Sequence, residues 1–130
     1  MGLIGTTLKR KMMDFDSRAR GIENYTTTSD LAYVLEKIYR QDFLGQQLSQ
    51  IALALLKGQR VKDRLPRYLP QNIVVAHKTG LEKGIVHDAG IVFTPKGNYI
   101  ICVLTHKLGN YSEAKKFIAD LSLLTYNLYE

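Results

Sequence analysis

The sequence predicts an α+β fold in which an antiparallel sheet of three strands is packed by a carboxy-terminal helix and preceded by a pair of helices. Apolar and β-branched runs at 73–77, 89–93 and 99–104 are separated by turn residues, as in successive strands. Apolar residues recur at helical spacing before and after these runs, at 27–58 and 110–128. A length of 130 residues with 45% hydrophobic content suits one compact core.

Residues 1–25 are predicted to be loop-rich, because glycines interrupt any apolar period and charged residues fall on every side. Thr27 then offers a capping hydroxyl, and Asp30 follows one turn into the predicted helix, as in a capping box. The apolar residues of this helix are Leu31, Val34, Leu35, Ile38 and Tyr39.

A second helix is expected from Asp42 to Gly58, with a tight corner between the two helices near Gln41. Its predicted apolar face holds Leu44, Leu48, Ile51, Ala52, Leu55 and Leu56. The segment 59–71 is basic and contains two prolines, neither of which can donate to a strand ladder, so a connecting loop is expected there.

The first predicted strand, 73–77, is bounded by Asn72 and Gly80, and the next two flank a five-residue hairpin loop at 94–98. Asn110 is expected to cap the terminal helix, with Glu113 one turn in. The predicted buried stripe of that helix is Ala114, Phe117, Ile118, Leu121, Leu124, Thr125 and Leu128.

The overall charge is +6, from 18 basic and 12 acidic residues, yet no nucleic-acid-binding motif accompanies the basic runs. We therefore expect ordinary solvated faces and no nucleic-acid partner. The longest apolar stretches are far shorter than the ~20 residues of a membrane span. Cys102 is the only cysteine and is interpreted as packing, and His87 and His106 lack the neighbours of a metal site, so no metal or cofactor is expected.

Lys78-Thr79-Gly80 follows the first predicted strand directly. An ammonium, a hydroxyl and a glycine without a side chain in the way suit a strand edge that recognises a carboxylate. The tripeptide is short, and the alternative is a polar strand end that leads into a loop. His77 precedes the motif and is expected on the opposite face of the strand, in a supporting or packing role.

The order of several segments around this motif resembles the second half of the class A β-lactamase family and its penicillin-binding serine hydrolase relatives. The segments are Leu8-Lys9-Arg10, 24–32, Arg64-Leu65-Pro66, 76–80, 88–92 and the terminal helix. The resemblance implies that residues 1–130 are the carboxy-terminal portion of a single β-lactamase-like domain, with an omega-loop-like segment at 1–26, helices at 27–58 and the sheet with its terminal helix at 72–130. In the intact family the sheet has five strands, and the other two come from the amino-terminal end.

The same resemblance assigns substrate binding to Lys78, Thr79, Gly80 and the backbone N–H of Leu81, which would stabilise an oxyanion. It implies a parent serine hydrolase that acts on β-lactams or related amides and esters, with a β-lactam or peptidoglycan-like ligand. It also implies a periplasmic or extracellular location. The nucleophile is expected upstream of residue 1, so no catalytic residue is assigned here and the chain alone is expected to be inactive.

Two strings mimic the missing motifs. Ser112-Glu113-Ala114-Lys115 has Ser-x-x-Lys spacing but follows the Lys-Thr-Gly strand, so it is interpreted as coincidence. Ser29-Asp30 is followed by Leu31 and is interpreted as a helix start.

Setting Leu8 and Arg10 on the family's omega loop places Met12 at the position of the deacylating Glu, and Met cannot accept a proton. Asp14 and Glu23 are possible substitutes, and neither is assigned. Such a site would hydrolyse slowly, as a penicillin-binding protein does.

Two interpretations stay open: a β-lactamase-like enzyme, or a non-catalytic module that binds a carboxylate, peptidoglycan or a protein partner. An upstream Ser-x-x-Lys followed by Ser-x-Asn would favour the enzyme. A bare strand edge and uncovered apolar surface on 31–56 are also expected. We therefore expect a homo-oligomer or association with a separate amino-terminal part.

Overall fold

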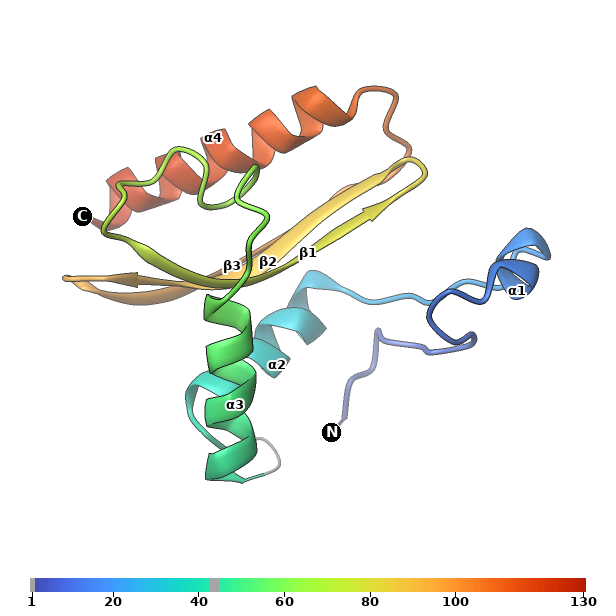
Figure 1. Ribbon diagram of the computed structural model, residues 1–130, viewed down its shortest axis with the longest axis horizontal. Coiled ribbons are helices and arrows are strands. Elements are labelled where there is room, and N and C mark those ends of the chain that lie inside the picture. Colours follow the sequence, from blue (N-terminus) through green and yellow to red (C-terminus); the bar gives the residue numbers. More distant parts are fainter. Residues whose placement is uncertain (1, 43–44) are drawn as a thin grey trace.

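The computed structural model describes residues 2–42 and 45–130 and has three layers (Figure 1). The middle layer is a three-stranded antiparallel sheet. Helix α4 (Tyr111–Tyr129) covers one face, and helices α2 (Thr28–Tyr39) and α3 (Gln46–Lys57) cover part of the other. The α+β architecture predicted from the sequence is confirmed.

The sheet has the order β1-β2-β3, with β1 at Val74–Glu82, β2 at Ile85–Thr94 and β3 at Gly97–Leu104. All three strands are longer than predicted. The hairpin loop expected at 94–98 is reduced to two residues, because Thr94 pairs with Gly97. Gly80, expected to bound the first strand, lies within it and pairs with His87. Backbone pairing continues where the apolar pattern stops, because ladder hydrogen bonds do not depend on side-chain type.

Helix α2 begins as predicted: the Thr27 side chain accepts a hydrogen bond from the Asp30 N–H at 3.1 Å. The Asp30 carboxylate differs from a capping box. It accepts hydrogen bonds from the Gly5 N–H at 3.0 Å and from the Thr6 hydroxyl at 2.6 Å. The buried carboxylate therefore attaches the amino-terminal segment to the start of α2.

Helix α3 begins at Gln46 and not at Asp42, and its N-cap Gly45 has a φ of 88°. The positive φ explains the late start, since a helix cannot continue through that conformation. Leu44, a member of the predicted apolar face, lies outside the described residues. Gln41 has a φ of 59°, which makes the expected corner at the end of α2.

Helix α1 (Phe15–Ala19) is a correction to the loop-rich prediction for residues 1–25. Asp14 caps it by accepting a hydrogen bond from the Ser17 N–H at 2.9 Å. The short helix has no long apolar stripe, so periodicity gave no signal for it. An isolated antiparallel β-bridge between Thr7 and Tyr25 joins the two ends of the stretch that contains α1.

Two apolar clusters lie on opposite faces of the sheet. The cluster under α4 contains Leu65, Leu69, Val75, Val86, Val92, Val103, Ala114 and Ile118. The cluster under α2 and α3 contains Leu35, Ala76, Ala89 and Ile91, with Leu53 and Leu56 packed against it. The expected connecting segment 59–71 contributes Leu65 to the first cluster, so it is a packed part of the core.

The predicted stripe of α4 is partly wrong. Phe117, Leu124 and Leu128 are exposed, whereas Ala119 and Ser122 are buried. The helix turns small residues toward the sheet, which lets its backbone approach closely. On α3, Leu48, Ile51 and Leu55 of the predicted face are exposed in the same way.

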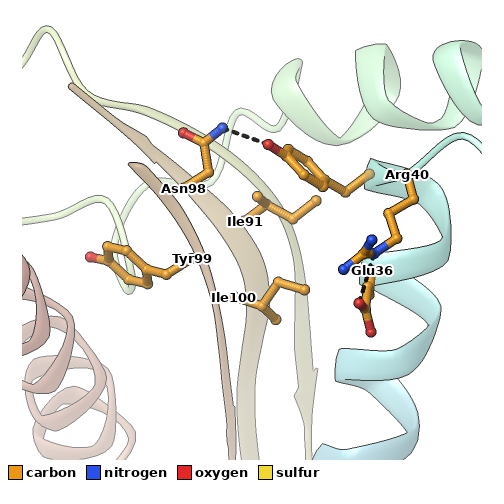
Figure 2. A pocket seen from close by; sticks show the side chains of 7 residues that line it. Glu36, Arg40, Ile91, Asn98, Tyr99 and Ile100 are labelled. Carbon is orange, nitrogen blue, oxygen red and sulfur yellow. Dashed lines mark hydrogen bonds and ion pairs between the residues drawn. The ribbon is translucent and has the colours of Figure 1, made fainter. Parts of the chain in front are cut away.

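A small hollow lies between the end of α2 and the β2–β3 hairpin (Figure 2). There the Tyr39 hydroxyl accepts a hydrogen bond from the Asn98 amide at 2.9 Å, and Glu36 pairs with Arg40 at 2.8 Å. The Tyr39 ring also contacts Phe93, with ring centroids 6.2 Å apart. These contacts attach the carboxy-terminal end of α2 to the end of the sheet that the β2–β3 hairpin forms.

Candidate functional site

The residues proposed from the sequence lie together on β1, which is an edge strand because, within residues 2–42 and 45–130, it pairs with β2 alone. Lys78 is exposed, and its Nζ donates to the Thr79 carbonyl at 2.6 Å. Among residues 2–42 and 45–130, no ion pair involves Lys78. Its ammonium therefore has no carboxylate partner in the part of the chain that the structure describes.

Strand alternation separates the motif's side chains. Lys78 and Gly80 share a face with Ala76, which packs toward α2 and α3, whereas Thr79 shares a face with Val75, which packs toward α4. A ligand can contact both Lys78 and the Thr79 hydroxyl only at the unpaired edge of β1. The Leu81 side chain is 57% exposed at the same end of the strand.

The packing around position 80, which the sequence did not reveal, explains why a glycine is found there. A Cβ at this position would lie 3.2 Å from the Cβ of His87 and 3.4 Å from its Cδ2. The absent side chain therefore leaves room for the imidazole of the paired strand. His87 was considered from the sequence only as a metal ligand, and the register that brings it to Gly80 is not visible there.

His77 lies where the sequence placed it, on the face opposite Lys78, and is 1% exposed. Its Nδ1 lies 2.8 Å and 3.0 Å from the two carboxylate oxygens of Asp88, which is fully buried. Asp88 Oδ2 also accepts a hydrogen bond from the Leu65 N–H at 3.1 Å. The Asp88 carboxylate of β2 is thus bonded both to β1 and to the connecting segment 59–71, on the face of the sheet opposite Lys78.

Gly90 makes this arrangement possible, because a Cβ there would lie 2.6 Å from the His77 Cβ and 2.8 Å from the Ala76 carbonyl oxygen. Nearby, the buried Arg64 has its Nη1 3.1 Å from Asp63 Oδ1, and Lys115 of α4 pairs with Asp63 Oδ2 at 2.7 Å. These charges connect the terminal helix to the same segment.

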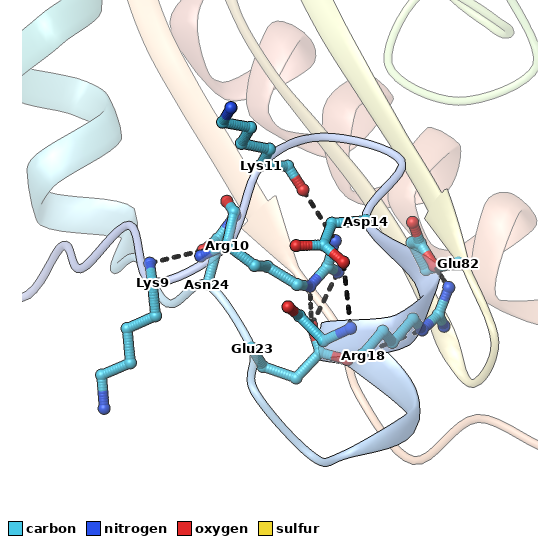
Figure 3. A network of polar contacts seen from close by, with 9 residues as sticks. Lys9, Arg10, Lys11, Asp14, Arg18, Glu23, Asn24 and Glu82 are labelled. Carbon is cyan, nitrogen blue, oxygen red and sulfur yellow. Dashed lines mark hydrogen bonds and ion pairs between the residues drawn. The ribbon is translucent and has the colours of Figure 1, made fainter.

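The omega-loop-like segment is held by ion pairs (Figure 3). Arg10 Nη2 contacts Glu23 Oε2 at 2.7 Å, and Arg18 Nε lies 3.6 Å from Glu23 Oε1. Arg18 also pairs with Glu82 at the end of β1. The Asn24 side chain makes two hydrogen bonds to the backbone of Arg10. Its amide NH₂ donates to the Arg10 carbonyl, and its amide oxygen accepts from the Arg10 N–H. The segment is therefore attached to the Glu82 end of β1.

Neither carboxylate considered as a substitute for the missing base is free. Glu23 is engaged by Arg10 and Arg18, and the hydrogen bonds that Asp14 accepts from Ser17 lower the pKa of Asp14. Met12, at the expected position of the base, is 83% exposed. Ser112 lies in the first turn of α4, which covers the face opposite Lys78.

Other titratable and metal-binding features are modest. Burial raises the pKa of the Cys102 thiol to about 11, so the thiol is protonated near neutral pH. In the described part of the chain, no three His, Cys, Asp or Glu side chains gather as metal ligands. Within the same residues, no helix combines the length and apolarity required to span a bilayer.

His87 is expected to make stability depend on pH. Burial, and after it the charge of Arg64, holds the pKa of His87 below its ordinary value of 6.5, while a backbone contact with Val86 raises it. As pH falls through 6.5, the unfolded chain takes up a proton before the folded chain does, so the free energy of unfolding falls. Urea midpoints at pH 7.5 and 5.5 measure this change. The decrease should be smaller in His87→Gln, and an equal decrease would contradict the assignment.

An antiparallel sheet with helices on both faces gives this chain the α+β architecture of the solved beta-lactamases that it matches. A model of the Beta-lactamase enzyme family matches residues 1–129. The chain therefore belongs to the Beta-lactamase enzyme family.

Individual relatives agree. Beta-lactamase VEB-1 of Pseudomonas aeruginosa is 37% identical over 75 residues, which cover 52% of this chain and 25% of VEB-1. The crystal structure of a beta-lactamase from Sphaerobacter thermophilus matches with a TM-score of 0.87 and 26% identity, over 98% of this chain and 49% of that one. PBP-A matches with a TM-score of 0.85 and 26% identity, over 98% and 47%. The chain thus spans about half the length of these solved structures.

Proposed function

We propose that the edge of β1 is the carboxylate-binding wall of a β-lactamase-like serine hydrolase site, which acts by acyl transfer on β-lactams or related amides and esters. Lys78 attracts the ligand carboxylate, Thr79 donates a hydroxyl hydrogen bond to it, and Gly80 leaves room for the His87 ring beside them. The Leu81 N–H stabilises the developing oxyanion. The single observation that supports this assignment most is an exposed ammonium without a carboxylate partner among the described residues, on an unpaired strand edge.

The family membership adds support from one solved relative. A variant of PBP-A was solved as an acyl-enzyme complex with penicillin G, at 26% identity to this chain. We propose a β-lactam or a peptidoglycan-like peptide as the ligand of the present site for this reason. The same family membership favours a periplasmic or extracellular location for the whole protein.

A second candidate function is a non-catalytic module that binds a carboxylate in peptidoglycan or in a protein partner. Two observations favour this function. Asp14 accepts a hydrogen bond from Ser17 and Glu23 pairs with Arg10, and Ser112 lies on α4, which covers the face of the sheet opposite Lys78. Under this proposal the same strand edge binds its ligand and no acyl-enzyme forms.

Ligand binding can be tested on the chain itself. In a titration with benzylpenicillin followed by ¹H–¹⁵N NMR, the amides of residues 78–81 should shift and saturate. Lys78→Ala should weaken binding about tenfold or more, since hydrogen bonds to charged groups contribute about 1.5–3 kcal/mol. Lys96→Ala, which removes a lysine from the β2–β3 hairpin, should leave affinity unchanged. Equal affinity in both variants would exclude the proposed wall.

Hydrolysis and acylation by the chain can be tested in parallel. The only Ser-x-x-Lys string in this sequence lies on α4, so the 130-residue chain should not hydrolyse nitrocefin or form a penicillin adduct visible by mass spectrometry. A stoichiometric adduct on Ser112 would overturn this expectation.

We further propose that residues 1–130 form the carboxy-terminal portion of one β-lactamase-like domain and that the chain associates, with a second copy or with a separate amino-terminal part. In the part of the chain that the structure describes, strand β3 pairs only with β2, and the strand from Gly97 to Leu104 contains no charged residue. Exposed leucines on α3 and α4 support the same proposal. A folded monomer at high concentration in sedimentation experiments would contradict association of copies.

A further inference from the structure

We propose that His87 is a third side-chain donor at this binding edge, after Lys78 and Thr79, with its Nε2–H group donating a hydrogen bond to the ligand carboxylate that Lys78 attracts. The inference rests on the proposed function and extends it to a residue on the neighbouring strand. With it the site has one cationic side-chain donor, Lys78, and two neutral ones, Thr79 of β1 and His87 of β2.

Register and packing bring the imidazole to the site. His87 pairs with Gly80 across the β1–β2 ladder, so its side chain lies on the same face as Lys78. The short distance between its Cδ2 and the Cβ position of residue 80, 3.4 Å, shows that the ring lies over the motif's glycine. Because Cδ2 is bonded to Nε2, the Nε2 edge of the ring is the edge nearest β1.

The opposite nitrogen favours one tautomer. The Thr105 N–H donates to Nδ1 of His87 at 3.0 Å, and an Nδ1 that accepts this hydrogen bond favours the neutral ring with its proton on Nε2. Thr105 is itself held by Val86, whose carbonyl accepts from the Thr105 hydroxyl at 2.5 Å and whose N–H donates to it at 3.2 Å. The ring is therefore oriented before any ligand arrives.

Nε2 remains available to a ligand. It makes no hydrogen bond within residues 2–42 and 45–130, and it is absent from the buried unpaired polar atoms of those residues, so it reaches solvent. Of the charged groups around it, Glu82 is engaged by Arg18 and Asp88 faces His77 on the other side of the sheet. Lys78 contacts the Thr79 carbonyl and has no carboxylate partner among the described residues. A neutral donor beside a single ammonium suits a ligand with one carboxylate.

The test compares three chains at pH 7.5 in the benzylpenicillin titration. His87→Phe keeps a ring of similar shape but removes the donor, and affinity should fall about three- to tenfold, the effect of one net hydrogen bond. His87→Gln retains an acceptor for Thr105 and an amide donor, so its affinity should stay close to that of the unaltered chain. The ¹⁵N resonance of His87 Nε2 should also shift on binding.

Two further ligands identify what His87 contacts. Benzylpenicillin methyl ester lacks the carboxylate and should bind all three chains equally weakly, whereas N-acetyl-D-alanyl-D-alanine tests whether a peptide carboxylate gives the same ranking as a β-lactam. Unchanged affinity in His87→Phe, together with weakened binding in Lys78→Ala, would overturn this inference alone. Absence of carboxylate-dependent binding by the unaltered chain would overturn the proposed function and this inference together.

Discussion

Replacement of Asp88 by Ala is expected to lower the free energy of unfolding by about 2–6 kcal/mol, because each buried donor that loses its acceptor costs about 1–3 kcal/mol. The carboxylate is fully buried and accepts hydrogen bonds from His77 and from the Leu65 N–H. Its removal leaves two buried donors without an acceptor. Urea unfolding followed by circular dichroism measures the loss, and Asp88→Asn gives a milder variant of the same size.

A matched control for Asp88 exists on α4. Asp120 has a side chain that is 50% exposed and pairs with Lys116 one turn earlier, at 2.6 Å. Exposed pairs of this kind contribute about 0.3–0.5 kcal/mol, so Asp120→Ala should unfold at nearly the original urea midpoint. Similar losses in the two variants would show that the His77–Asp88 contact does not stabilise the strand beneath the motif.

Truncation of Ile118 to Ala is expected to destabilise the chain by about 2–5 kcal/mol through lost apolar contacts and the cavity that remains. Ile118 is fully buried and belongs to the cluster between α4 and the sheet. Leu124→Ala is the control on the same helix, because Leu124 is 56% exposed and its loss should change stability by no more than about 0.5 kcal/mol. A larger effect at Leu124 than at Ile118 would mean that α4 presents a different face to the sheet in solution.

The helices and strands were largely predictable because their signals are local. Thr27 and Asn110 cap α2 and α4 as expected, since a capping side chain acts on backbone groups two or three residues away. The strand ends were predicted less well. The ladder from Lys78 to Glu82 contains one apolar side chain, Leu81, and no apolar alternation, so only pairing with β2 reveals it.

The site was predictable in part. Lys78 and Thr79 could be named because they stand in a short motif within a recognisable order of segments. His87 and Asp88 could not be named, because their roles depend on which residues of β1 they meet. A shift of register by one residue would exchange them between the two faces of the sheet.

The sequence by itself determined the α+β class, the order of the elements and the family, because all three depend on local pattern and on order along the chain. Only the tertiary structure decided the buried face of α4, the role of the motif's glycine and the neighbours of the motif. The physical reason is that residues seven to eleven positions apart along a hairpin, such as Gly80 and His87 or His77 and Asp88, meet through strand pairing. Lys78 could therefore be identified from the order of residues along the chain, whereas the position of the His87 imidazole beside β1 follows from the register between β1 and β2.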